Sequence, residues 1–227
     1  MALDLEDAYN RVDFNILLRI LKNIAIDPYI VMWIGKALLK RKVALRVGAR
    51  TSNVKSITSG LPQDSALSPV FFNVCTIGIT STQLEAPGRT LSFADDVLVY
   101  RHGKNRQEIA DSVQQELDRI EEWCTEMNGK IHPDKATTLW CSLNNHAVKA
   151  DMPEVSIDGK AIKREHILRY LGIIFDRSLS GKDHVTRIIQ KSRKGLTALK
   201  TMASLKMPQR VLMILYKALV LSVIEHG

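Results

Sequence analysis

Phe93-Ala94-Asp95-Asp96-Val97 is the stretch that decides the fold. It lies between two apolar, partly alternating runs, residues 89–93 and 97–100, so the pattern predicts a β-hairpin with adjacent carboxylates at its tip. Like charges side by side repel and raise the pKa of one carboxylate. A hard divalent cation such as Mg2+, which takes oxygen ligands, would remove that repulsion. The pair therefore indicates either a cation site or an ordinary solvated turn, because Asp favours turns for backbone reasons alone.

Two further stretches favour the cation site. Asp4-Leu5-Glu6-Asp7-Ala8-Tyr9 stands near the start of the chain, and Gly60-Leu61-Pro62-Gln63-Asp64-Ser65 lies between it and the hairpin. In this order and spacing the three stretches resemble the palm of reverse transcriptases, most closely the jockey-like enzymes of non-LTR retrotransposons. That family has an Asp opening a D-x-x-x-A-[FY] segment, a P-Q-G-S segment and a [YF]-x-D-D turn. The resemblance runs from Asp4 to about the C-terminus.

The resemblance implies an α+β fold: a polymerase palm with helices packed on one face of a small antiparallel sheet, followed by a helical thumb fragment. Residues 1–178 would form the palm, with 14–59 as a helical and hairpin insertion between motifs. Residues 179–227 would be the truncated start of the thumb. The family's fingers precede the first motif, so we expect the fingers and the rest of the thumb to belong to the same polyprotein outside this chain.

The resemblance also implies a metal site. Asp4, Asp95 and Asp96 would be catalytic carboxylates, and with the backbone carbonyl of Leu5 they would hold two Mg2+ ions, with Mn2+ as the alternative. Two such ions, about 3.5 to 4 Å apart, activate an attacking hydroxyl and neutralise a leaving pyrophosphate. Lys135 resembles the family's catalytic lysine near the triphosphate, where it could neutralise or protonate pyrophosphate. Its alternative is a solvated lysine that enters a strand.

Glu6 and Asp7 are expected outside the metal site. Side chains alternate between the two faces of a strand, and the turn that follows redirects the chain. Asp4 itself has an alternative role as a capping residue at a strand end.

Substrate-binding positions follow from the same resemblance. Tyr9 matches the family's aromatic gate, which packs under the sugar of the incoming nucleotide and excludes a 2'-hydroxyl. An ordinary core aromatic is its alternative. Gln63, with Pro62 and Ser65 beside it, matches the segment that contacts the incoming nucleotide, and its amide can both donate and accept hydrogen bonds. Tyr170-Leu171-Gly172 resembles the primer-grip hairpin, where a Gly turn brings the backbone close to the primer strand.

The implied activity is RNA-directed DNA polymerisation in retrotransposition. Deoxynucleoside triphosphates would be added to the 3'-hydroxyl of a DNA primer on an RNA template. The net charge of +8 and pI near 9.4 favour a polyanionic partner, either nucleic acid or an acidic membrane surface. We expect no membrane partner, because the apolar segment 209–225 carries Lys217 in its middle.

The remaining composition fits an ordinary globular protein, with 45% hydrophobic and 25% charged residues. Cys75, Cys124 and Cys141 are odd in number and widely spaced, which predicts buried free thiols in a reducing compartment. His residues show no HxxxH or HxxE grouping, which argues against zinc. With no leader or transmembrane pattern, we expect an intracellular protein of the nucleus or cytoplasm.

Periodicity and capping signals predict the other elements. Helices are expected from Asn or Asp caps, from Ser-Pro or Asp-Pro starts and from apolar spacing. They cover residues 14–24, 28–40, 68–83, 105–128 and 209–225, with a basic helical run from Lys182. Gly129 is expected to end the fourth of these helices. Strand patterns cover residues 43–57 as a hairpin, 135–143, 155–162 as a hairpin around Asp158-Gly159, and 168–175. The basic helical run would lie along the phosphates of the product duplex or be a solvated face.

Asp64 departs from the family pattern, which has Gly at this position. Gly lets the backbone approach nucleotide and template closely, whereas Asp adds bulk and negative charge beside phosphates. We therefore expect impaired catalysis.

Two other functions remain open. The chain could be a catalytically inactive, decayed or repurposed nucleic-acid-binding fragment, which Asp64 and the missing fingers favour. It could also be an RNA-templated RNA polymerase, which shares the carboxylate palm, although Tyr9 and the Phe-Ala-Asp-Asp turn argue against that.

Overall fold

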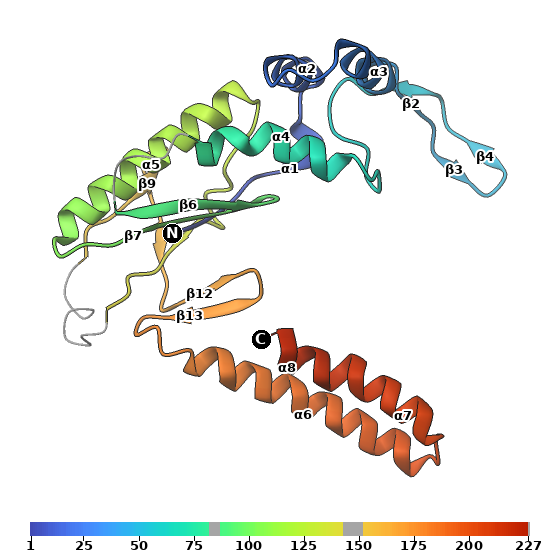
Figure 1. Ribbon diagram of the computed structural model, residues 1–227, viewed down its shortest axis with the longest axis vertical. Coiled ribbons are helices and arrows are strands. Elements are labelled where there is room, and N and C mark those ends of the chain that lie inside the picture. The colour runs from blue at the N-terminus through green and yellow to red at the C-terminus, as the bar shows by residue number, and fades with distance from the viewer. Residues whose placement is uncertain (82–86, 143–151, 227) are drawn as a thin grey trace. The chain divides into compact units, whose positions relative to one another are not determined.

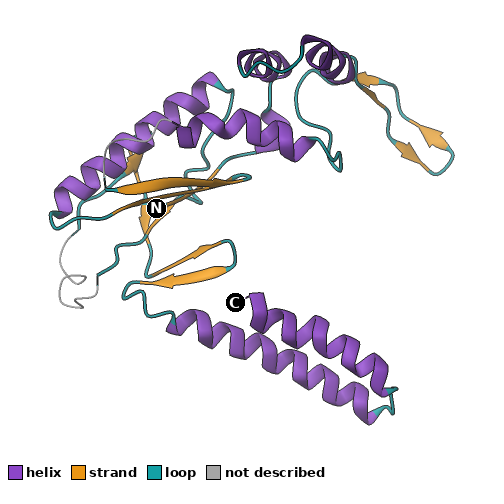
Figure 2. Cartoon of the chain, in the orientation of Figure 1, coloured by secondary structure: helices purple, strands orange, loops and turns teal. Residues whose placement is uncertain are grey.

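The computed structural model describes residues 1–81, 87–142 and 152–226 (Figure 1). The chain divides into two compact units. The first consists of Met1–Ala136 with Pro153–Lys163, and the second of Thr137–Met152 with Arg164–Gly227. Each unit combines helices with short strands (Figure 2), which confirms the α+β class.

An antiparallel sheet organises the first unit. Strands β1 (Ala2–Asp4), β7 (Asp96–Arg101) and β6 (Gly88–Phe93) lie side by side in the order β1-β7-β6. Phe93 pairs with Asp96, so Ala94 and Asp95 form the turn, and Ala94 has the left-handed φ of 50°. The hairpin prediction is confirmed, with Asp96 as the first residue of β7.

Five helices form in the described part of the first unit, and three of them begin at the predicted capping residues Asp13, Asp27 and Asn105. Their bounds are α1 (Ala8–Arg11), α2 (Phe14–Asn23), α3 (Pro28–Leu39), α4 (Ser68–Ser81) and α5 (Arg106–Glu126). The carboxylate of Asp13 accepts hydrogen bonds from the backbone N of Asn15 and Ile16, and Asp27 accepts one from Tyr29. Such side-chain caps satisfy the free amides of a helix start.

Helix α5 begins and ends close to its predicted bounds. The side chain of Asn105 accepts a hydrogen bond from the backbone N of Gln107. At the other end the helix stops at Glu126, before Gly129 as predicted, and the left-handed residue is Asn128, with φ of 57°. Asn tolerates that conformation better than most residues with a β-carbon. Gly129 still donates its N to the carbonyl of Cys124 at 2.7 Å.

Helices α4 and α5 lie on one face of the β6–β7 hairpin (Figure 1). The core of this unit, to which α2 also contributes, contains side chains that are almost completely excluded from solvent. The largest apolar ones are Phe14, Leu17, Ile79, Val97, Val99, Leu117 and Ile120. Burial of a side chain of this size stabilises a fold by roughly 1.5 to 3 kcal/mol. The placement of helices on one face of the sheet, as predicted, follows from this core.

Two further hairpins belong to the first unit. One runs from β2 (Lys42–Val43) and β3 (Arg46–Val47) back through β4 (Arg50–Thr51) and β5 (Lys55–Ser56). The other joins β9 (Ser156–Ile157) to β10 (Lys160–Ala161) through Asp158 and Gly159, both with positive φ. Both lie where the alternation predicts them.

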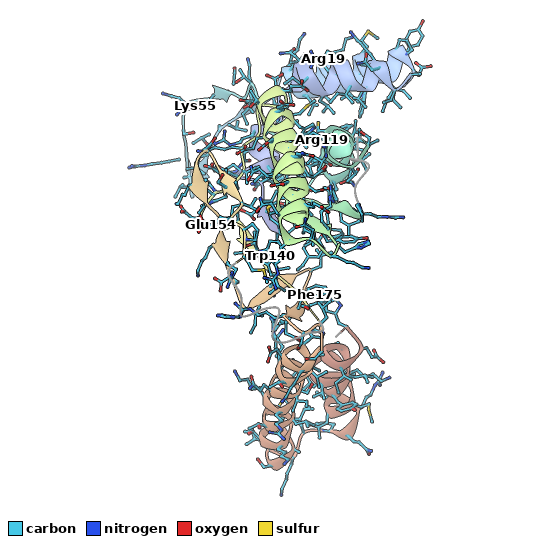
Figure 3. All side chains as sticks on the ribbon, turned by 90° about the vertical axis from the view of Figure 1, so that its left-hand side faces the viewer. Arg19, Lys55, Arg119, Trp140, Glu154 and Phe175 are labelled. Carbon is cyan, nitrogen blue, oxygen red and sulfur yellow. The ribbon has the colours of Figure 1, made fainter. Side chains whose placement is uncertain are left out.

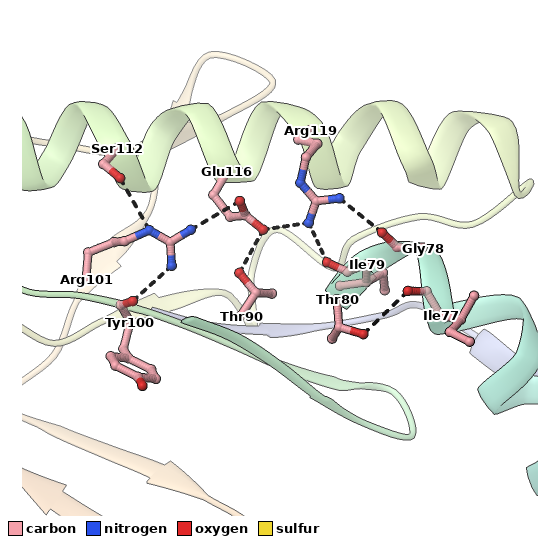
Figure 4. A network of polar contacts seen from close by, with 10 residues as sticks. All are labelled: Ile77, Gly78, Ile79, Thr80, Thr90, Tyr100, Arg101, Ser112, Glu116 and Arg119. Carbon is pink, nitrogen blue, oxygen red and sulfur yellow. Dashed lines mark hydrogen bonds and ion pairs between the residues drawn. The ribbon is translucent and has the colours of Figure 1, made fainter. Parts of the chain in front are cut away.

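A buried ionic cluster joins the hairpin to α5 and α4 (Figure 4). The carboxylate of Glu116, which is fully buried, lies 3.1 Å from the guanidinium of Arg101 and 2.6 Å from that of Arg119. It also accepts a hydrogen bond of 2.7 Å from the Thr90 hydroxyl. Arg119 donates in turn to the carbonyls of Gly78 and Ile79. Glu116 therefore compensates two cations drawn from different elements.

Replacement of Glu116 should destabilise the first unit strongly. Glu116→Ala leaves the buried Arg101 without this counter-ion, and breaking such a pair costs about 3 to 5 kcal/mol of unfolding free energy. Urea denaturation followed by circular dichroism measures the change. The matched control is Glu122→Ala, an exposed carboxylate on the same helix, which should shift the unfolding free energy by less than about 0.5 kcal/mol. Equal effects of the two substitutions would contradict the role of the cluster.

The second unit contains a short hairpin and a pair of long helical segments (Figure 2). Strands β12 (Ile167–Tyr170) and β13 (Ile173–Asp176) pair with each other, and α6 (Lys182–Ser204) follows. After Pro208 the chain forms α7 (Gln209–Tyr216), a π-helical turn (Lys217–Leu221) and α8 (Ser222–His226). Every helix in the described part of the chain is too short or too polar to cross a bilayer.

Two strand predictions are wrong in extent. The predicted strand 168–175 is the β12–β13 hairpin, because Leu171 and Gly172 adopt φ of 47° and 88° and reverse the chain. Of the predicted strand 135–143, only β8 (Thr137–Thr138) is formed, with β11 (Lys163–Arg164) as a neighbour, and residue 143 lies outside the described residues. Residues 82–83 of the third predicted helix are also outside them.

The cysteine prediction holds in part. Cys75, Cys124 and Cys141 are free thiols. Cys75 and Cys124 are buried, and burial raises the pKa of Cys75 to about 11 and that of Cys124 to about 12. Cys141 is exposed, which contradicts the predicted burial of all three thiols.

Asp176 fixes the start of α6 in the second unit. Its buried carboxylate accepts hydrogen bonds from the backbone N of Ser178, Ser180 and Gly181 and from both serine hydroxyls. These donors, the Ser178 hydroxyl first, hold the pKa of Asp176 well below its usual range. The carboxylate thus ties the end of β13 to the turn that precedes α6.

Asp176 should make the second unit sensitive to acid. The pKa of Asp176 is lower in the folded chain than in the unfolded chain. Its contribution to the free energy of unfolding is therefore complete above the pKa of the unfolded chain, near 4, and is lost as the pH falls below that value. Asp176→Asn should weaken the unit at neutral pH and flatten the pH dependence below about pH 5. Thermal melts between pH 7 and pH 2 measure both effects. A variant that keeps the same acid slope as the unchanged chain would contradict this assignment.

Candidate active site

Strand register brings the first and third motifs together. Asp4 is the direct cross-strand partner of Asp96, and Leu3 is the partner of Val97. Directly opposite residues of an antiparallel pair point to the same face of the sheet, with Cβ atoms about 4.5 to 5.5 Å apart. The backbone N of Leu5 donates to the carbonyl of Asp95 at 3.0 Å, which pins the turn to the end of β1. Three carboxylates from distant motifs therefore gather at one edge of the sheet.

The carboxylates affect one another electrostatically. Partial burial raises the pKa of Asp96, and the neighbouring charges of Asp95 and Asp4 raise it further, while Lys135 lowers it. The ammonium of Lys135 lies 2.7 Å from the carboxylate of Asp4, and this hydrogen-bonded pair raises the pKa of Lys135. The side chain of Lys135 is nevertheless 59% exposed. The acidic cluster thus repels itself and is partly compensated by the exposed ammonium of Lys135.

The donor chemistry suits a divalent cation. Carboxylate oxygens are the ligands that Mg2+ prefers, and the negative charges of Asp95 and Asp4 add to burial in raising the pKa of Asp96. In the described residues, however, no three His, Cys, Asp or Glu side chains converge closely enough to hold a metal ion as they stand. Lys135 already occupies one carboxylate oxygen of Asp4. A cation at Asp4 would therefore compete with Lys135 and require the carboxylates to rotate inward.

An open cavity of about 530 Å³ adjoins the carboxylates. Its lining includes six predicted site residues: Asp4, Leu5, Tyr9, Gln63, Asp95 and Lys135. Asp96, Pro62 and Ser65 do not line it. Asn10 and His132 do, although the sequence motifs gave neither a role at the site. The structure thus gathers the motif residues around one space large enough for a small ligand.

His132 is the more informative of the two additions. Its backbone N donates to the carbonyl of Asp4 at 2.8 Å, and its Nδ1 atom is buried without a hydrogen-bond partner in the described part of the chain. Buried polar atoms of this kind are uncommon in native proteins and call for an explanation such as a bound water or ligand. The sequence signal for it is its place in the segment His132-Pro133-Asp134-Lys135, which resembles the fourth motif of the family and in which His132 replaces a common Asn.

Glu6 is paired elsewhere. Its carboxylate lies 3.5 Å from the guanidinium of Arg11 and 3.5 Å from the ammonium of Lys130. Asp7 has a left-handed backbone and precedes α1. Both residues nevertheless line the same cavity as Asp4 and Asp95, and the charge of Asp7 adds to that of Asp4 in raising the pKa of Lys135.

Tyr9 packs face to face against Phe72 of α4. The ring centroids are 4.7 Å apart and the planes differ by 13°. Phe72 is buried, whereas Tyr9 is only half-buried and reaches the cavity. Stacking on a fixed ring restricts the Tyr9 side chain to one position. Tyr9 is therefore neither a pure core residue nor a freely moving surface group.

Backbone contacts join the second motif to the first. The N of Gly60 donates to the carbonyl of Val12, and the N of Leu61 donates to that of Tyr9. Gly60 has φ of 85°, and a β-carbon there would lie 2.9 Å from the carbonyl oxygen of Asn10. Only Gly accommodates both the conformation and this close approach. Gln63 is carried to the cavity by this junction.

Pro62 and Ser65 shape the turn into α4. The carbonyl of Pro62 accepts hydrogen bonds from the Ser68 hydroxyl at 2.5 Å and from the N of Ser65. Ser65 accepts a hydrogen bond from the N of Leu67 through its hydroxyl. Between them, Asp64 is exposed and has the left-handed φ of 61°. Asp tolerates that conformation better than most residues with a β-carbon, but Gly is the residue best suited to it.

The predicted primer-grip residues lie in the second unit. Tyr170 ends β12, and Leu171 with Gly172 forms the turn to β13. A tight Gly-containing turn is present, as the motif predicts.

Comparison with protein families gives one match over most of the chain. The family described as reverse transcriptase (RNA-dependent DNA polymerase) matches residues 1–175.

Three curated relatives are similar over most of this chain. An RNA-directed DNA polymerase from mobile element jockey of Drosophila funebris is 30% identical over 86% of the chain and 21% of its own length. Its counterpart in Drosophila melanogaster is 27% identical over 84% of this chain and 21% of its own length. A retrovirus-related Pol polyprotein from the type-1 retrotransposable element R2 of Popillia japonica is 25% identical over 77% of this chain and 30% of its own length. The chain thus spans about a fifth of the length of the two jockey relatives.

One solved structure is similar over part of the chain. It is an apo telomerase from Candida tropicalis truncated from its C-terminal domain, with a TM-score of 0.48 and 12% identity over 79% of this chain and 34% of that one.

Proposed function

This chain belongs to the reverse transcriptase family, and from that membership we propose that it catalyses RNA-directed DNA polymerisation as part of a non-LTR retrotransposon protein. The observation that carries the proposal is the register of the sheet, which sets Asp4 directly opposite Asp96 beside the cavity. Carboxylates on neighbouring strands are what a nucleotidyl-transfer site with two cations requires.

Asp4, Asp95 and Asp96, with the carbonyl of Leu5, would hold two Mg2+ ions or, as the alternative, Mn2+. The ions when bound would lower the pKa of the primer 3'-hydroxyl and neutralise the leaving pyrophosphate. Lys135 would leave Asp4 and turn to the triphosphate, where its ammonium can neutralise charge or donate a proton. Its exposed side chain leaves it free to swing.

Tyr9 and Gln63 would bind the incoming deoxynucleotide. The ring of Tyr9, held by Phe72, would lie under the sugar and exclude a 2'-hydroxyl by contact. The amide of Gln63 would donate to or accept from the nucleotide, while Pro62 and Ser65 hold the turn that presents it. Selection for deoxynucleotides favours a DNA product over the RNA-polymerase alternative.

The partners of this activity would be an RNA template, a DNA primer and deoxynucleoside triphosphates. Residues 1–178 would serve as the palm, with 14–59 as the insertion, and 179–227 as the start of the thumb. Tyr170, Leu171 and Gly172 would contact the primer strand through the tight turn at Gly172. Fingers and the remaining thumb would come from the same polyprotein, at a site in the nucleus or cytoplasm.

A second candidate is an inactive fragment that binds nucleic acid. The observation that favours it is Asp64, which places a β-carbon and a carboxylate at a left-handed position where Gly is expected. The retained carboxylates, Tyr9 and Gln63 favour the polymerase.

Asp95→Ala tests the proposal directly. Primer extension on an RNA template with Mg2+ or Mn2+ should fall by about 100-fold or more, the scale on which loss of one preorganised electrostatic group slows a reaction. The control is Asp111→Ala, an exposed carboxylate on α5, which should extend the primer at the unchanged rate. Equal incorporation by the chain and by Asp95→Ala would remove the enzyme claim.

Asp64→Gly should raise the incorporation rate. Removal of the side chain relieves both the strained φ of 61° and the negative charge near phosphates, and a gain of about tenfold corresponds to ~1.4 kcal/mol of barrier. Asp64→Asn separates the two effects, because Asn keeps the β-carbon and the shape of Asp but lacks its charge. A higher incorporation rate in both variants would show that the charge of Asp64 slows the reaction. A higher rate in Asp64→Gly alone would show that its β-carbon does. An unchanged rate in both would show that Asp64 does not limit catalysis.

A further inference from the structure

The segment between the first two motifs carries charge of one sign only. Every ionisable side chain between Asp27 and Asp64, apart from Tyr29, is basic: Lys36, Lys40, Arg41, Lys42, Arg46, Arg50 and Lys55. Surface charge of both signs is normal for a solvated face, so a stretch of this length without a carboxylate creates a local positive potential. That potential attracts a polyanion.

Helix α3 presents aromatic rings in line with part of this charge. Tyr29, Trp33, Lys36 and Lys40 follow a spacing of four, three and four residues and are all exposed, which places them along one face of the helix. We call these four residues the α3 stripe. Tyr29 is 78% exposed and Trp33 60% exposed, whereas the opposite face of α3 is buried through Val31, Ile34 and Leu38. Helix α3 thus has a fixed inner face and an unusually aromatic outer face.

The hairpin β2–β5 continues from the end of the helix. It runs from Lys42 to Ser56 (Figure 1), and its residues are all exposed. Lys42, Arg46, Arg50 and Lys55 lie on it, and Lys55 is labelled in Figure 3. Arg41 is different, because its guanidinium lies 5.6 Å above the ring of Phe14 and belongs to the packing of α2.

The chemistry of this surface matches an unpaired nucleic-acid strand. Exposed aromatic faces stack on bases only where the bases are not already stacked in a duplex, and basic side chains beside them contact the backbone phosphates. Base stacking on an aromatic ring is tolerant of sequence because every base has a π-face. The segment between Asp27 and Asp64 carries no carboxylate, so phosphates bound along it would meet no repulsion from its own side chains.

We propose that the α3 stripe and the basic hairpin Lys42–Ser56 form a binding site for single-stranded RNA. The choice of RNA over DNA rests on the proposed function, which uses an RNA template. The site is formed by surface residues that line neither the carboxylate cluster nor its cavity, so it can be tested by binding without catalysis.

The first test removes charge. A labelled single-stranded RNA of about 20 nucleotides, longer than the 4–16 of one typical site, is titrated with the full chain by fluorescence anisotropy at several salt concentrations. In a variant with Lys42, Arg46, Arg50 and Lys55 changed to Gln, the slope of log K against log salt should fall in magnitude by about 2 to 3, at about 0.7 per phosphate contact. A slope unchanged from that of the original chain would overturn the proposal.

The matched control removes the same number of charges from exposed positions outside the α3 stripe, the basic hairpin and α6. Arg89, Lys104, Lys160 and Arg164 are changed to Gln in place of the hairpin residues. RNA affinity and salt slope should stay close to those of the original chain. An equal loss in both variants would show that net charge, and not this surface, binds the strand, and would overturn the proposal. Circular dichroism and thermal melts confirm that both variants are folded.

The second test removes a stacking platform. Trp33→Ala should weaken RNA binding by about 5- to 150-fold, the range that loss of one stacked base gives. Ile30→Ala, a comparably exposed apolar position on the same helix, should change affinity less than about twofold, because an aliphatic side chain provides no π-face. Equal effects at both positions would overturn the stacking assignment.

Three further outcomes separate the alternatives. Tighter binding of a DNA strand of the same sequence would overturn the assignment to RNA. Unchanged RNA affinity in Trp33→Ala together with a changed oligomeric state in sedimentation would identify a protein interface and overturn the proposal. If Asp95→Ala loses primer extension but still binds RNA, both the polymerase proposal and the RNA-binding proposal are supported. If the chain extends primers but the Trp33 and hairpin variants bind RNA as tightly as the original chain, only the RNA-binding proposal is contradicted.

Discussion

The pairing of Asp4 with Asp96 is the constraint on which the site depends. Side chains alternate along a strand, so a slip of one residue between β1 and β7 would turn one of the two carboxylates to the opposite face. The register is specified by burial: Leu3, Val97 and Val99 are almost completely excluded from solvent and can face only the core. The apolar side of the sheet therefore determines where its acidic edge lies.

Two buried features hold that sheet in place. Glu116 neutralises Arg101 at the end of β7 and Arg119 on its own helix, so the hairpin, α5 and the end of α4 share one ionic cluster. Gly60 brings the second motif against the backbone of the first at a distance that no side chain would permit. The exposed acidic turn can remain electrostatically strained because the structure behind it is well packed. Lys135 offsets part of that strain from outside.

Sequence patterns predicted most elements because their signals are local. Caps at Asp13, Asp27 and Asn105 and the alternation around Ala94 and Asp95 each depend on residues within a few positions, and all appear where expected. The pattern failed at 168–175, where Leu171 and Gly172 reverse a run that reads as one continuous strand. It failed again after Lys135, because β-propensity indicates an extended chain but not the length over which a partner strand is available.

By itself the sequence determined the family, the order of the motifs and the residues that could bear the chemistry, because those are properties of residue type and spacing. Only the tertiary structure decided which of them meet. It placed Asp4 opposite Asp96, paired Lys135 with Asp4, stacked Tyr9 on Phe72 and added His132 to the cavity. These contacts join residues far apart in the chain, and their geometry is set by the packing of a shared core that no local pattern encodes.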